Sequence, residues 1–168
     1  MSIVTANLAM SLDGCTAGPH QSREHPFGTG ADALTAWMFE TEQPGRGQDA
    51  QLLTDGLMGA GAAVPRTGPL EMRGGTTFTF VTGGLETALE QARKAAGERD
   101  VEIAGGASPV RQYLAAGLLD ALVLHLVPVV LGAGERLFEG LAQLALTPVE
   151  VISSPTVTHL RYRTARRD

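Results

Sequence analysis

The chain has 168 residues and a formal net charge of −5 at pH 7, with 43% hydrophobic and 18% charged residues. This length suits a single domain, residues 1–168, with a sizeable core, and the acidic balance argues against nucleic acid as a partner. Cys15 is the only cysteine, which excludes an intrachain disulfide and fits a reducing cytoplasm. Because the sequence shows neither an export signal nor a long apolar run, we expect a cytoplasmic protein without a membrane partner.

The predicted elements follow from hydrophobic periodicity and from turn residues. In chain order they are a strand at residues 3–10, helices at 32–39 and 49–58, strands at 60–64 and 76–82, a helix at 85–96, a strand at 101–104, a helix from Pro109 to Gly117, and strands at 118–130, 144–152 and 156–164. The middle of the chain therefore alternates strand and helix, which favours parallel strands joined by right-handed crossovers. The last two strands are joined at residues 153–155 and predict an antiparallel hairpin added to that sheet.

The turn after residues 101–104 is the most informative feature of the chain. Gly105-Gly106 follows the strand at once, and Ser108 reads as a helix N-cap with Pro109 at the first helical position. Such a turn lets the backbone approach a phosphate closely, and a helix N-terminus favours negative charge. The alternative is an ordinary tight turn that needs positive φ.

Candidate side chains lie elsewhere as well. Asp13 ends the first strand, where a carboxylate would orient a polar substrate or relay a proton, or would only cap the backbone of its own turn. Trp37 would line a pocket or belong to the core. His20 and His25 lie on a loop near the expected mouth of the site, where a histidine would either titrate or simply be solvated. The sequence offers no metal site.

Four stretches resemble the dihydrofolate-reductase-like superfamily, and within it the reductase domain of the bifunctional riboflavin-biosynthesis deaminase/reductase and its stand-alone relatives. They are M-S-L-D-G at 10–14, G-G-A at 105–107, L-A-A-G-L-L-D at 114–120 and P-V-V-L-G-A-G-E-R-L-F at 128–138. The resemblance implies a three-layer α/β/α sandwich around a mixed, mostly parallel sheet of about seven to eight strands. It also implies NADPH-dependent reduction of a small heterocyclic or sugar-like carbonyl or imine, and a homodimer, which the apolar strand at 122–131 also suggests.

The resemblance assigns roles to individual residues. Asp13 would be the catalytic residue beside the nicotinamide and the substrate, and Gly132 would lie on a loop at the mouth of the site. The residues implied in substrate binding are Ser11, Asp13, Trp37 and Gly132, and those implied in holding the cofactor pyrophosphate are Gly105, Gly106, Ala107 and Ser108.

One departure from the family opens a second hypothesis. After residues 60–64 the family continues into a Gly-Arg turn, a helix and another strand, whereas this chain passes directly through residues 65–68 to residues 70–76. The absence of this turn, helix and strand would remove half of the groups that hold the cofactor in the family. Arg66 would replace them in part. The chain would then be a reductase fold repurposed for cofactor-independent chemistry, for example in secondary metabolism, or for ligand binding alone.

Overall fold

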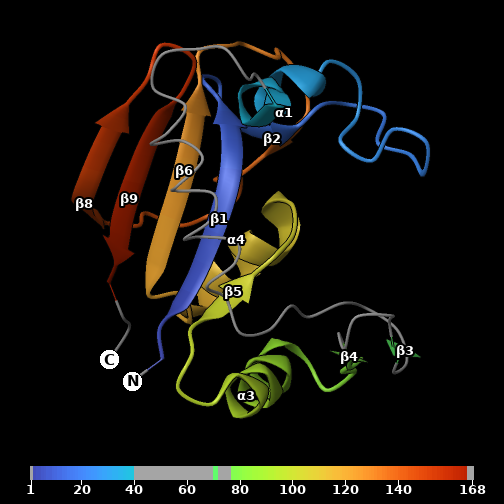
Figure 1. Ribbon diagram of the computed structural model, residues 1–168, viewed down its shortest axis with the longest axis vertical. Helices are drawn as coiled ribbons and strands as arrows, with labels where there is room; N and C mark the ends of the chain where they lie inside the picture. Colours follow the sequence, from blue (N-terminus) through green and yellow to red (C-terminus); the bar gives the residue numbers. More distant parts are fainter. Residues whose placement is uncertain (1, 40–69, 72–76, 166–168) are drawn as a thin grey trace.

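The computed structural model describes residues 2–39, 70–71 and 77–165 (Figure 1). The described elements are β1 (Val4–Ser11), β2 (Cys15–Ala17), α1 (Asp32–Phe39), β3 (Leu70–Glu71), β4 (Thr77–Phe78), α3 (Leu85–Ala96), β5 (Val101–Ile103), α4 (Ala107–Ala116), β6 (Ala121–Val127), β7 (Glu135–Arg136), β8 (Leu146–Ser153) and β9 (Thr158–Thr164). The helix expected at 49–58, the strand at 60–64 and the shortened segment with Arg66 lie outside these residues.

The central sheet is mixed, as predicted. Its strand order is β5-β1-β6-β9-β8, with β1 parallel to both β5 and β6, and with β9 antiparallel to both β6 and β8. The C-terminal hairpin is therefore confirmed. The described part of this sheet has five strands rather than seven or eight, because β2 pairs with β7 and β3 with β4 in separate two-stranded sheets.

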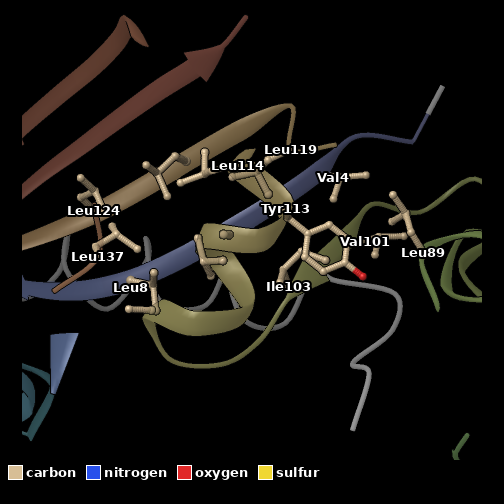
Figure 2. Close-up of a cluster of buried hydrophobic side chains, with 14 of the residues drawn as sticks. Val4, Leu8, Leu89, Val101, Ile103, Tyr113, Leu114, Leu119, Leu124 and Leu137 are labelled. Atoms are coloured by element: carbon tan, nitrogen blue, oxygen red, sulfur yellow. The ribbon is translucent and has the colours of Figure 1, made fainter. Parts of the chain in front are cut away.

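Two cores on opposite faces of this sheet confirm the three layers. The residues of β1 alternate: Val4, Ala6, Leu8 and Met10 face α3 and α4, whereas Ala9 faces α1. Figure 2 shows the first core, in which side chains from β1, β5 and β6 meet those of both helices. The second core joins α1 to the ends of β6 and β9. Since β6 contributes Leu122 and Leu124 to the first core and Val127 to the second, its apolar sequence is explained by burial on both faces.

The helices follow the predicted pattern with one correction. α1 and α3 have the predicted bounds, and α4 ends at Gly117, which adopts the left-handed conformation of a helix C-cap. The N-cap of α4 is Gly106, not Ser108. Gly106 has the extended backbone that an N-cap needs, so Ser108 and Pro109 become the second and third helical residues. Proline is tolerated there because the first turn does not require its N–H.

A second difference concerns residues 76–82, which are strand only at Thr77–Phe78. β-propensity expresses itself through pairing and packing against neighbours, and the described residues that follow Phe78 pair with no strand before α3 begins. No helix in the described part of the chain is both long and apolar enough to cross a membrane.

Candidate functional site

The carboxylate of Asp13 is held just after β1 by one hydroxyl donor and two backbone N–H donors, with the Cys15 thiol 3.8 Å from Oδ2. The Ser11 hydroxyl donates to Oδ1 at 2.7 Å, the Leu131 N–H donates to Oδ1 at 3.0 Å, and the Gly132 N–H donates to Oδ2 at 2.9 Å. In addition, the Leu12 N–H donates to the Val129 carbonyl at 2.8 Å. The turn after β1 and the loop at 129–132 are therefore fastened to each other, and Asp13 is their main junction.

The same contacts keep Asp13 ionised. Donation from Ser11 and from the Leu131 N–H lowers the pKa of Asp13 to about 2, against a smaller opposing effect of desolvation. An Arg136 guanidinium nitrogen lies 3.7 Å from Oδ2, and the other terminal nitrogen donates to the Asp13 carbonyl. A carboxyl group with such a low pKa carries no proton near neutral pH, so Asp13 acts there as a fixed negative charge.

Ser11 and Cys15 form the buried support of this charge. The Ser11 hydroxyl, which is fully buried, accepts from the Cys15 N–H at 2.9 Å while it donates to Asp13. Burial, followed by the nearby Asp13 charge, raises the pKa of the Cys15 thiol. Cys15 is therefore a structural thiol rather than a nucleophile.

The strand pair β2–β7 brings the segment at 134–136 against the turn after β1. Ala17 is the register partner of Glu135, and Cys15 is that of Arg136. Gly134 has φ +145°, and a Cβ on it would stand 2.0 Å from the Ala17 carbonyl oxygen. Only glycine permits this backbone approach, so Gly134 determines how Glu135 and Arg136 are presented.

The turn before α4 has the backbone expected of an anion site. Gly105 has φ +151°, where a Cβ would also stand 2.8 Å from Cγ of Pro109. No side chain caps α4, and its first turn carries no acidic residue. The N–H groups of Ala107 and Ser108 lie at a helix N-terminus, where backbone donors and the helix dipole favour negative charge.

Three charged side chains connect this turn to Asp13. Arg111, on α4, lies 3.5 Å from Oε1 of Glu135 and donates to the Arg136 carbonyl at 3.1 Å. The other oxygen of Glu135 lies 3.2 Å from the place where a Cβ on Gly106 would stand. The structure thus links the Asp13 junction to the turn before α4. Arg136 contacts Asp13, and Glu135 and Arg111 continue the link to Gly106. The three linking residues were missed by the sequence analysis, because nothing in their spacing predicts that β7 contacts α4.

Trp37 lies apart from these residues, in the core beneath α1. It is 4% exposed, and its indole N–H donates to the Leu34 carbonyl at 2.8 Å. Its ring lies 5.0 Å from that of His125 and 5.2 Å from that of His159. The Nδ1 atoms of the two histidines are 2.6 Å apart, and His125 Nε2 contacts the Asn7 side-chain oxygen. This arrangement agrees with the core interpretation of Trp37 and with a hydrogen-bonded interior role for His125.

The remaining candidates are surface residues. His20 and His25 are exposed on the loop between β2 and α1, and the described residues form no cluster of three or more His, Cys, Asp or Glu side chains that could hold a metal ion.

The fold and the site define a three-layer α/β sandwich with a candidate site beyond the ends of two parallel strands, and comparison with known proteins gives its family. The chain belongs to the family of the RibD C-terminal domain, which its sequence matches over residues 46–160. No curated protein sequence matches it.

Several solved structures share the fold. A protein of Shewanella sp. PV-4 assigned to riboflavin biosynthesis has a TM-score of 0.61 and 18% identity, with 99% of this chain and 100% of that chain covered. The riboflavin biosynthesis reductase Rib7 of Saccharomyces cerevisiae has a TM-score of 0.55 and 17% identity, with 98% and 89% covered.

A third structure is bifunctional. It is the diaminohydroxyphosphoribosylaminopyrimidine deaminase/5-amino-6-(5-phosphoribosylamino)uracil reductase of Thermotoga maritima, with a TM-score of 0.56 and 13% identity. The alignment covers 98% of this chain but 57% of that protein. At these identities the three likenesses establish the fold alone.

Proposed function

We propose that this protein is a cytoplasmic, NADPH-dependent reductase of a small heterocyclic or sugar-like substrate. One observation carries the proposal: the uncapped N-terminus of α4 and the fixed carboxylate of Asp13 are connected through Arg111, Glu135 and Arg136. Both groups follow parallel strands of the central sheet, and ligands of open α/β sheets bind beyond the carboxyl ends of such strands. Family membership supports the same chemistry.

The backbone before α4 fits the pyrophosphate of a dinucleotide. Gly105 adopts a conformation that side chains rarely allow, Gly106 has no Cβ to block approach, and Ala107 and Ser108 present N–H groups at the helix end. When bound, NADPH would supply a hydride to a carbonyl or imine carbon. The charge of Glu135 opposes this fit.

The substrate would lie against the junction of the turn after β1 and the loop at 129–132. Gly132 is exposed there, and the Asp13 side chain is 18% exposed. As a fixed anion, Asp13 would orient donor groups of the substrate rather than relay a proton. Ser11 is buried and would act by holding Asp13 in place.

A second function remains as the alternative: a reductase fold repurposed for cofactor-independent chemistry or for ligand binding alone. The Glu135 carboxylate beside Gly106 favours it, because a like charge at the expected pyrophosphate site weakens dinucleotide binding.

A titration with NADPH, followed by nicotinamide fluorescence and by calorimetry, separates the two functions. We expect saturable binding that Gly106→Val weakens at least tenfold, since its Cβ would occupy the approach to the turn. Ala115→Val is the matched control, because it introduces the same valine side chain at an exposed position of α4.

Single-turnover oxidation of bound NADPH by 5-amino-6-(5-phosphoribosylamino)uracil and by simpler ribosylaminopyrimidines then tests the substrate class. If the folded chain does not bind NADPH, whether or not one of these pyrimidine substrates is present, the reductase is rejected in favour of the alternative.

A further inference from the structure

The position of Glu135 is set by its backbone. β7 is paired with β2 through Ala17, and the Thr16 hydroxyl donates to the Glu135 carbonyl at 3.4 Å. The close contact between Gly134 and the Ala17 carbonyl fixes the approach to this strand. Glu135 therefore projects from an anchored strand and not from a loop tip.

The side chain of Glu135 is directed at the turn before α4. One carboxylate oxygen lies 3.2 Å from the position of a Cβ on Gly106, and the other lies 3.5 Å from a guanidinium nitrogen of Arg111. The side chains of Glu135 and Arg111 are 24% and 25% exposed. The carboxylate thus lies between Arg111 and the place at which a phosphate would approach Gly106.

A carboxylate in this place competes with a bound phosphate. A helix N-terminus favours a nearby negative charge, and the Glu135 carboxylate is a negative group that the structure already places beside Gly106. Arg111 offers a single positive charge, part of which is committed to Glu135 and to the Arg136 carbonyl. An incoming pyrophosphate must either repel Glu135 at short range or draw Arg111 away from it, and partial burial weakens the screening of both effects.

We infer that Glu135 is a specificity-determining residue that selects against dinucleotides at the Gly105–Ser108 turn. The inference rests on the proposed function, because that function places the pyrophosphate at this turn. Its consequence is that the natural chain binds NADPH more weakly than its backbone allows, and that removal of one charge restores tight binding.

The test compares the wild-type protein with Glu135→Gln, which keeps the size of the side chain and removes its charge. Glu139→Gln is the matched control, since Glu139 is exposed and the net charge changes by the same amount. Binding of NADPH and of inorganic pyrophosphate is measured by calorimetry, and the amide resonances of Gly105, Gly106 and Ser108 report where each ligand binds. Glu135→Ala repeats the test without a side-chain amide.

We expect Glu135→Gln to bind both ligands about tenfold more tightly, equivalent to about 1.4 kcal/mol, and Glu139→Gln to stay within twofold of the wild type. The gain should shrink as salt is raised. Equal NADPH affinity of the wild type and both Glu135 variants would overturn the inference and leave the reductase standing. Tighter NADPH binding by the Glu135 variants without hydride transfer to any ribosylaminopyrimidine would uphold the inference and reject the reductase, and no NADPH binding by any variant would reject both.

Discussion

Under the proposed function, Asp13 has a structural role and a binding role. Its carboxylate is the junction between the turn after β1 and the loop at 129–132, and it is also the negative charge that a substrate would meet. A low pKa serves both roles. The donors stabilise the ionised carboxylate, and this stabilisation of the junction is lost when Asp13 is protonated.

We predict that ionised Asp13 stabilises the folded protein and that this stabilisation is lost at acid pH. The pKa of Asp13 is about 2 in the folded state and about 3.9 in an unfolded chain. Above about pH 5 the carboxylate is ionised in both states and its stabilisation is complete, and as the pH falls from about 5 to 2, through the unfolded and then the folded pKa, that stabilisation is progressively lost. In Asp13→Asn this loss is absent, so the denaturant midpoints of the wild type and the variant should converge as the pH falls from 5 to 2.

The control for this experiment is Glu90→Gln, on the exposed face of α3. Its midpoint should stay parallel to that of the wild type over the same range. If the difference in denaturant midpoint between the wild type and Asp13→Asn is constant from pH 5 to 2, the carboxylate does not hold the turn after β1 to the loop at 129–132.

Gly105 and Gly106 should respond differently to alanine. Gly105→Ala places a Cβ at φ +151° and against Pro109, so we expect a loss of about 1–3 kcal/mol in unfolding free energy. Gly106→Ala keeps an allowed extended backbone and meets only the movable end of Glu135, so its stability should change by less than about 1 kcal/mol. Urea unfolding of both variants measures the difference, and equal destabilisation would contradict the described turn.

At the scale of the element, α1 closes one face of the sheet through Leu34 and Trp37, which pack against Val127 and Val157. We therefore expect Trp37→Phe to lower the unfolding free energy by about 1–3 kcal/mol, since it removes the N–H bond and part of the packing. The same variant should leave the Kd for NADPH and the KM for the substrate within twofold. A changed KM with unchanged stability would instead make Trp37 a wall of the binding site.

The elements themselves were largely predictable from the sequence. Periodicity gave the bounds of α1 and α3, and the Gly117 stop is confirmed, because these signals are local. The start of α4 was wrong, because Ser108 is a good N-cap in isolation but Gly106 satisfies the backbone geometry first.

The candidate site was predictable only in part. Asp13 and Gly106 were found because each follows a strand and accompanies a recognisable turn. Arg111, Glu135 and Arg136 were not, because their meeting depends on the pairing of β2 with β7, and that pairing depends on the contact between Gly134 and Ala17. Such contacts between distant segments leave no periodic signal in the sequence. The pairing of His125 with His159 is similar, since it requires the register of β6 with β9.

At the scale of the whole molecule, the two cores share β1 and β6, so the described residues are expected to unfold together; a single domain at 1–168 stays a prediction.

We also propose a homodimer, with β8 as the contact. β8 is an edge of the central sheet in the part of the chain that is described, and it exposes Val149 and Val151 at 58% and 61%.

Light scattering after gel filtration tests the dimer. We expect the wild type at tens of micromolar to have twice the chain mass, and a Val149→Lys/Val151→Lys double variant to be monomeric. Gln91→Lys, an exposed change on α3 and away from β8, should stay dimeric. A monomeric wild type would reject the dimer, and a dimeric double variant would reject β8 as the contact.

The strand order also determines when the fold can assemble. β1 is an inner strand of the sheet, yet both of its partners come about a hundred residues or more later in the chain: Val4 is in register with Val101, and Thr5 with Ala121. The first strand of the chain must therefore stay unpaired within this sheet while about a hundred residues follow it from the ribosome. Pairing across such sequence distances is slow, and an apolar strand that waits for its partners is exposed to aggregation. For this protein the vulnerable interval lies before β6 is made, and we expect its yield in cells to depend on chaperones that cover β1 until then.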